Sequence, residues 1–117
     1  MYSRLDIIKK VQHFTSQIIN AGIPIDRVIL FGSYAKNNAH NNSDIDVALI
    51  SNVFSGFGFE DRKKFSKINI KKEFIDIETK TFSSDYFENG DPFTEEILTS
   101  GIEIYNSKSA NLDLQFN

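Results

Sequence analysis

The sequence of 117 residues has no cysteine, no apolar run of about 18 residues and no excess of positive charge. Because cysteine is absent, disulfide bonds and thiolate zinc sites are both excluded, and the composition fits a reducing compartment. Because no apolar run is long enough, we expect no segment to span a membrane. The first residues also lack the apolar region of a signal peptide. The sequence therefore predicts a cytoplasmic protein, and its length predicts one domain.

The charge balance argues against nucleic acid as a partner. The chain has 13 lysine and arginine residues against 16 aspartate and glutamate residues, which gives a formal net charge of -3. Proteins that bind a phosphate backbone usually present a basic face. Positive charge is clustered in lysine pairs at 9–10, 63–64 and 71–72, and we expect each pair on a solvated surface.

Hydrophobic spacing predicts helices over 3–20, 60–67 and 92–100. It predicts strands over 28–31, 45–50, 74–80 and 102–105. Ser3 and Asp6 have the spacing of a capping box at the start of the first helix. A short helical turn is expected over 33–37, directly after the first strand. These elements form one domain over 1–105, and a polar tail over 106–117 is expected to fray.

The most informative pattern joins the end of one apolar strand to the start of the next. Gly32 leaves room for a phosphate at the strand end, and Ser33 offers a hydroxyl and a backbone N–H group. Ten residues separate Ser33 from Asp44, and Asp46 follows two positions later. Residues i and i+2 of a strand point to one face, so these two carboxylates project together. A carboxylate pair can hold one or two Mg²⁺ ions, so the pattern predicts a site for a metal-bound nucleoside triphosphate.

Two other motifs do not fit this stretch. A calcium-binding loop that begins at Asp44 would require glycine and glutamate where the sequence has Leu49 and Ser55. A P-loop that begins at Gly32 would require glycine where the sequence has Asn37.

A third acid can come from the strand expected over 74–80. Its alternation places Asp76 and Glu78 on one face together with Phe74, and Ile75 and Ile77 on the other. Spacing alone does not distinguish the two acids. An acid beside the metal can also act as general base for an attacking hydroxyl.

The pattern Gly32-Ser33, ten residues, then Asp44-Ile45-Asp46 resembles the DNA polymerase β-type nucleotidyltransferase superfamily. Within it, the chain is similar to the small minimal nucleotidyltransferases, and the stretch over 95–105 is also similar to that branch. The resemblance implies an α/β fold in which helices flank a small mixed sheet. It implies Mg²⁺, two ions in the family, with ATP or another nucleoside triphosphate as substrate. The expected reaction transfers a nucleoside monophosphate to a hydroxyl group and releases pyrophosphate.

The resemblance also implies roles for individual residues. Asp44 and Asp46 correspond to the metal-binding pair, and Gly32 and Ser33 correspond to the triphosphate-binding turn. For the third metal-site acid we favour Asp76 as the deeper position.

Glu78 stays the alternative, since some relatives have an acid at that point. Many relatives have arginine after the Gly-Ser pair, where this chain has Tyr34. Lys36 can keep one phosphate contact in its place.

Family members of this size often pair with a helical HEPN protein in a toxin–antitoxin unit, and some transfer AMP to a tyrosine of that toxin. The resemblance therefore implies a HEPN-type protein as acceptor. Two alternatives stay open: a non-catalytic antitoxin that binds its partner, and a regulatory module that only binds nucleoside triphosphate.

Overall fold

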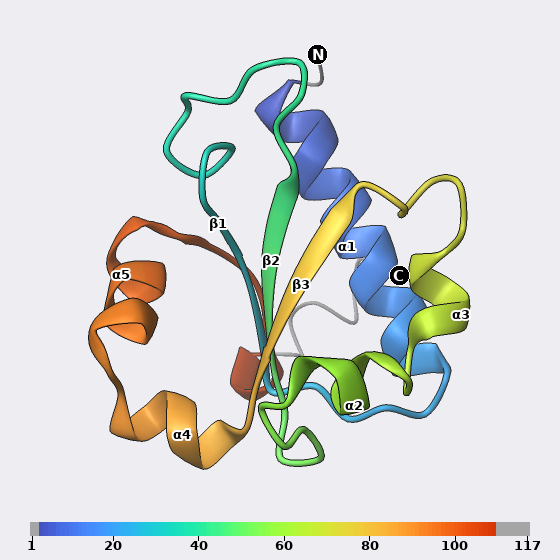
Figure 1. Ribbon diagram of the computed structural model, residues 1–117, viewed down its shortest axis with the longest axis vertical. Helices are drawn as coiled ribbons and strands as arrows, with labels where there is room; N and C mark the ends of the chain where they lie inside the picture. Colours follow the sequence, from blue (N-terminus) through green and yellow to red (C-terminus); the bar gives the residue numbers. More distant parts are fainter. Residues whose placement is uncertain (1–2, 110–117) are drawn as a thin grey trace.

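The computed structural model describes residues 3–109, which form a four-stranded sheet with helices on both faces (Figure 1). The strands are β1 (Arg27–Phe31), β2 (Ile45–Ile50), β3 (Ile77–Phe82) and β4 (Ile102–Asn106). Their order across the sheet is β3-β2-β1-β4. β1 is antiparallel to both β2 and β4, whereas β2 and β3 are parallel. The α/β fold with a small mixed sheet is thereby confirmed.

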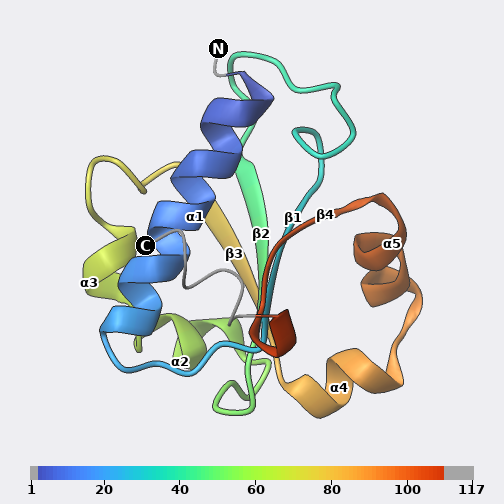
Figure 2. The same ribbon diagram turned by 180° about the vertical axis from the view of Figure 1, so that it is seen from behind.

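One face of the sheet is covered by α1 (Arg4–Asn20), with α2 (Gly58–Arg62) and α3 (Ser66–Asn69) on the same side (Figure 2). Ser3 and Asp6 form the predicted capping box at the start of α1. The buried stripe of α1 meets the inward side chains of the strands in the larger core. Its fully buried members include Ile7, Val11, Phe14, Ile18, Leu30, Val47, Leu49, Phe65 and Phe74.

The other face is covered by α4 (Ser84–Asn89) and α5 (Pro92–Ser100). The predicted helix over 92–100 is confirmed, and Asp91 caps its start. A second, smaller core lies beneath the two helices, and it contains Ile29, Ala48, Ile50, Phe82, Phe87 and Ile97. This smaller core covers the last residues of β2 and β3, whereas Glu78, which lies near the start of β3, is exposed. No helix within residues 3–109 is long and apolar enough to cross a membrane.

The strand predicted over 74–80 begins three residues later, at Ile77. Residues 74–76 form a turn that is closed by a bond from the Ile77 N–H to the Phe74 carbonyl (3.0 Å). The side chain of Asn69 donates to the same carbonyl at 3.0 Å. The predicted face was therefore wrong for this segment, because Phe74 is buried in the core and Ile75 is 63% exposed.

Other boundaries also differ from those predicted. The helix expected over 60–67 is divided into α2 and α3, and α4 was not predicted. Asn106 belongs to β4, and Ser107–Ser109 form a 3-10 turn. The rest of the predicted tail, 110–117, lies outside the described residues.

Candidate active site

The turn after β1 lies directly against the carboxylate of Asp46. Phe31 and Asp46 are register partners in the antiparallel pair of β1 and β2. Gly32 follows with a φ of 75°. A Cβ atom at Gly32 would lie 2.2 Å from Oδ2 of Asp46. Glycine is therefore required for two reasons, the backbone conformation and the contact with Asp46. The sequence pattern predicts only space for a phosphate at Gly32, and the contact with Asp46 is an additional finding.

The backbone after Gly32 forms the expected short helical turn. The Lys36 N–H donates to the Gly32 carbonyl at 3.0 Å, and the Asn38 N–H donates to the Ser33 carbonyl at 2.9 Å. Ser33 is half-buried at the start of this turn. Lys36 is exposed, and its Nζ atom lies 3.9 Å from Glu96 of α5.

Arg4 of α1 holds the same turn from the side of the core. Its guanidinium donates to the carbonyls of Tyr34, at 3.3 Å, and Ala35. Tyr34 itself is buried, with 6% of its surface exposed. The position at which many relatives have arginine is thus a core position here, and the cation beside the turn comes from α1. The sequence offered no local signal for this long-range contact.

Glu78 is the acid that the sheet places beside Asp46. The two residues are register partners in the parallel pair of β2 and β3, so their side chains leave the same face. Asp44 lies two residues before Asp46, just outside β2. Burial raises the pKa of Asp46, and the negative charges of Glu78 and Asp44 raise it further, whereas Lys80 lowers it. Asp46 therefore lies in the combined field of three charged neighbours.

Asp76 has a different environment. Both of its carboxylate oxygens accept from Nζ of Lys10, at 3.2 and 3.1 Å. Lys10 belongs to α1, which packs in the larger core, whereas Asp46 lies on the same face of β2 as Ala48 and Ile50 of the smaller core. Asp76 does line one cavity, of about 490 Å³, with Asp44 and Glu78. The structure therefore brings Glu78 beside Asp46 and pairs Asp76 with α1.

The donor atoms of this region suit a hard divalent cation. Within residues 3–109, no three histidine, cysteine, aspartate or glutamate side chains form a ready metal-binding group. Mg²⁺ commonly takes only one or two carboxylates from the protein, and substrate phosphates and water supply its other ligands. Asp46 and Glu78 with Asp44 nearby fit that mode of binding, since repulsion among their charges favours a cation.

Lys80 is a site residue that the sequence analysis did not select. It lies two residues after Glu78 on the same face of β3, and it is the register partner of Ala48. The alternation that indicated Glu78 also indicates Lys80, so the signal was present. Its positive charge lowers the pKa of Asp46 and so partly offsets the increase caused by burial and by the neighbouring acids.

Comparisons with known proteins agree with this architecture. The family model described as "Polymerase beta, Nucleotidyltransferase" matches residues 7–110. That span is most of the chain, and the protein belongs to this family of polymerase β-type nucleotidyltransferases.

Two solved structures have a similar fold. One is a protein from Sulfolobus solfataricus assigned as a nucleotidyltransferase; it is 13% identical with a TM-score of 0.67, and the match covers 91% of this chain and 86% of that chain. The other is a toxin–antitoxin complex with AMP-PNP; it is 18% identical with a TM-score of 0.58, and the match covers 86% of this chain and 77% of that chain. At these identities the likeness shows the fold alone. A sequence search of curated proteins gives no significant match.

Proposed function

We propose that this protein is a Mg²⁺-dependent nucleotidyltransferase that moves a nucleoside monophosphate, AMP from ATP, to a hydroxyl group of a partner protein. The observation that supports this best is the convergence of Gly32, Asp46 and Glu78 at one end of the sheet. The family to which the chain belongs is a family of nucleotidyltransferases. The similar toxin–antitoxin complex contains AMP-PNP, which supports a nucleotide and a protein partner. That the partner is of HEPN type and that the two act in the cytoplasm is part of the proposal and follows only from the family resemblance.

In this proposal some residues of the site bind the triphosphate and others bind the metal. The Gly32-Ser33 turn and Lys36 bind the triphosphate, and Asp46, Glu78 and Asp44 supply oxygen ligands. Mg²⁺, when bound there, would offset the charge of the phosphates and of the leaving pyrophosphate. We assign the role of third acid to Glu78 in place of Asp76, since the Asp76 carboxylate is paired with Lys10.

The transfer step requires a base and a leaving group. The acceptor hydroxyl gives its proton to a carboxylate, and its oxygen forms a bond to the α-phosphorus. The bond between the α-phosphorus and the bridging oxygen breaks in the same step, and pyrophosphate leaves with that electron pair. Glu78 is exposed and adjacent to Asp46, which is the position that such a base requires.

The test is transfer to the protein encoded beside this one, which is co-expressed and then examined by intact-mass spectrometry. We expect an added nucleoside monophosphate with the wild type and none with Asp46→Asn. Asp85→Asn is the matched control, because Asp85 is an exposed residue of α4 outside the site. An unmodified neighbour with wild type, Mg²⁺ and each of the four nucleoside triphosphates would contradict the proposal.

One observation favours the non-catalytic alternative. The position after Ser33 is the buried Tyr34, so the turn lacks the cation that many relatives have there. In that case the chain would bind its partner, or nucleoside triphosphate, without transfer. Neutralisation of a toxic neighbour by Asp46→Asn as fully as by wild type would support this alternative.

A further inference from the structure

The outer edge of β3 pairs with no further strand within residues 3–109, since β3 stands at the end of the sheet. The carbonyls of Asp76 and Phe82 accept from N–H groups of β2 and of the residue after it, each at 3.1 Å. Alternate residues of a strand direct their backbone groups to opposite sides, so Thr79 and Thr81 direct theirs away from β2. Such unpaired groups form a template for another strand.

Two cavities lie along this edge. One, of about 450 Å³, is lined by Gly56, Gly58, Phe59 and Phe93 among others. The other is the cavity of about 490 Å³ that contains Asp44 and Glu78. Arg62, Thr79 and Lys80 line both cavities, so the two are parts of one groove.

The groove contains a buried hydroxyl that lacks a partner. Thr79 is 4% exposed, and among the described residues nothing hydrogen-bonds to its Oγ1 atom. A buried polar atom of this kind usually has a partner in the functional state, and a ligand or water in the groove can supply it. Gly56, which also lines the groove, has no side chain, and nothing lies within 4 Å of the place where its Cβ atom would be, which leaves space for a backbone.

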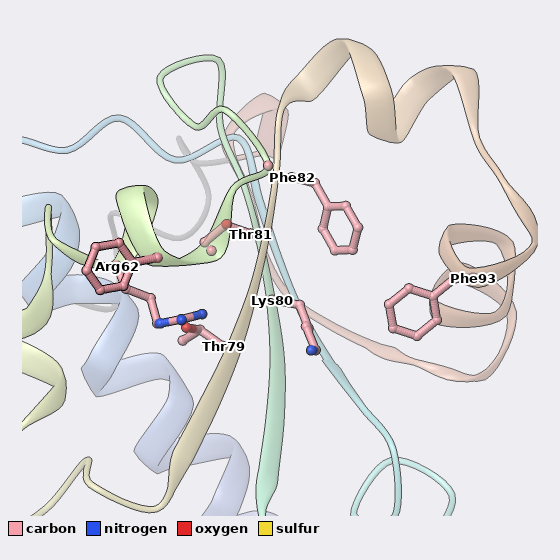
Figure 3. Close-up of a pocket in the computed structure, with 9 residues that line it drawn as sticks. Arg62, Thr79, Lys80, Thr81, Phe82 and Phe93 are labelled. Atoms are coloured by element: carbon pink, nitrogen blue, oxygen red, sulfur yellow. The ribbon is translucent and has the colours of Figure 1, made fainter.

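The charge of the groove indicates what binds there. Figure 3 shows Arg62 and Thr79 on one side of β3, and Lys80, Phe82 and Phe93 on the other. Side chains of an added strand alternate between these two sides, and each side offers a cation. Within residues 3–109, no carboxylate forms an ion pair with Arg62 or Lys80. A second copy of this chain would bring the same cations against them.

We propose that the edge of β3 binds an extended segment of a partner protein by strand addition, with acidic side chains against Arg62 and Lys80. Apolar side chains of the segment contact Phe59 and Phe93, which are 67% and 41% exposed. The Asp44 and Glu78 end of the groove repels acidic side chains, so the acids of the segment lie at the Arg62 end. The same segment would deliver the acceptor hydroxyl to Glu78, and this part of the inference rests on the proposed function. The binding of the segment to β3 does not depend on that function.

The test is an amide NMR titration of the full chain with a blocked peptide of about six residues that has two adjacent glutamates, one for each side of the added strand, flanked by valines, and that ends in tyrosine. We expect the Thr79 and Thr81 amides to shift, and affinity at least tenfold above that of a peptide with lysine in place of glutamate. Arg62→Gln should weaken binding at least fivefold. The matched control Lys64→Gln removes the same charge from an exposed residue outside both cavities, and it should change binding less than twofold.

The proposal is overturned if these amides do not shift, or if both peptides bind equally. It is also overturned if the same amides shift with protein concentration alone, which would indicate self-association, or if a single-stranded RNA oligonucleotide shifts them at lower concentration than the acidic peptide. The titration contains neither nucleotide nor Mg²⁺, so its result is independent of whether the chain transfers nucleotides.

Discussion

The acids near the candidate site should have opposite effects on stability when each is neutralised. Asp46 and Glu78 face each other across β2 and β3. At a strand separation of about 4.8 Å, two negative charges repel by about 1 kcal/mol in water and about 3 kcal/mol at an effective dielectric of 20. Because the site is half-exposed, the lower value applies best. Asp46→Asn and Glu78→Gln should each raise the free energy of unfolding by about 1 kcal/mol, or Tm by about 4 °C.

Asp76→Asn should lower stability, since it breaks a partly buried ion pair. The side chain of Lys10 is only 16% exposed and that of Asp76 is 36% exposed. Loss of the carboxylate leaves the Lys10 ammonium without that partner, which should cost about 1 kcal/mol or more. Neutralising Asp76 is therefore expected to lower the free energy of unfolding, whereas neutralising Glu78 is expected to raise it.

The assay is urea unfolding at pH 7 of wild type and the three variants, at low and high salt, with and without Mg²⁺. High salt should reduce the gains of Asp46→Asn and Glu78→Gln, because it screens the repulsion. Mg²⁺ should stabilise wild type and Asp76→Asn but not Asp46→Asn. If Asp46→Asn and Glu78→Gln lower stability as much as Asp76→Asn does, the proposed repulsion is wrong. If Asp76→Asn alone abolishes the response to Mg²⁺, the third acid is Asp76.

Three further predictions concern single residues. Gly32→Ala should abolish Mg²⁺-dependent ATP binding, measured by titration calorimetry, because the added Cβ atom displaces the Asp46 carboxylate. Gly22 also has a positive φ, but nothing lies within 4 Å of the place where its Cβ atom would be. The control Gly22→Ala should therefore lose only about 1 to 2 kcal/mol of stability. Thr79→Val should raise the free energy of unfolding by about 1 kcal/mol, since it removes a buried hydroxyl without a partner; equal or lower stability in urea would contradict this. Asp61→Asn should cost about 2 to 4 kcal/mol at pH 7 and less at pH 3, and an equal cost at both pH values would contradict this.

The pH dependence of the Asp61 effect follows from its hydrogen bonds. Burial raises the pKa of this carboxyl, but bonds from Thr81, Ser55 and the Gly56 N–H outweigh burial and hold the pKa below its ordinary value. The folded state therefore favours the ionised form. The ionised Asp61 carboxylate contributes fully to the free energy of unfolding above the ordinary pKa of about 4, and this contribution is lost as pH falls through the lower pKa of the folded state.

Features determined by local sequence were predicted well. β2 has the predicted bounds, and the capping box of Ser3 and Asp6 starts α1 as expected. The spacing from Gly32 to Asp46 indicated the family before any long-range contact was known, because the motif lies within one strand, one loop and the next strand.

Features determined by long-range packing were not predicted correctly from the sequence. The start of β3 depends on burial of Phe74 against Phe14, with ring centroids 5.3 Å apart, and on capping by Asn69. Alternation over 74–80 is the same whether or not that turn forms. The placement of Asp76 and Glu78 likewise depends on the register between β2 and β3 and on Lys10 of α1, neither of which is a local property.

The mixed sheet explains why this site forms at one end of the molecule. β1 is antiparallel to β2, so the end of β1 meets the start of β2, where Gly32 contacts Asp46. β3 is parallel to β2, so the start of β3 lies at that same end and brings Glu78 beside Asp46. An antiparallel β3 would have its start at the other end, under α4. Because β3 is also an edge strand, Glu78 remains exposed, whereas the Gly32 turn on the inner side is held by Arg4. The topology therefore separates an anchored side from an exposed side, which in the function we propose serve the nucleotide and the partner.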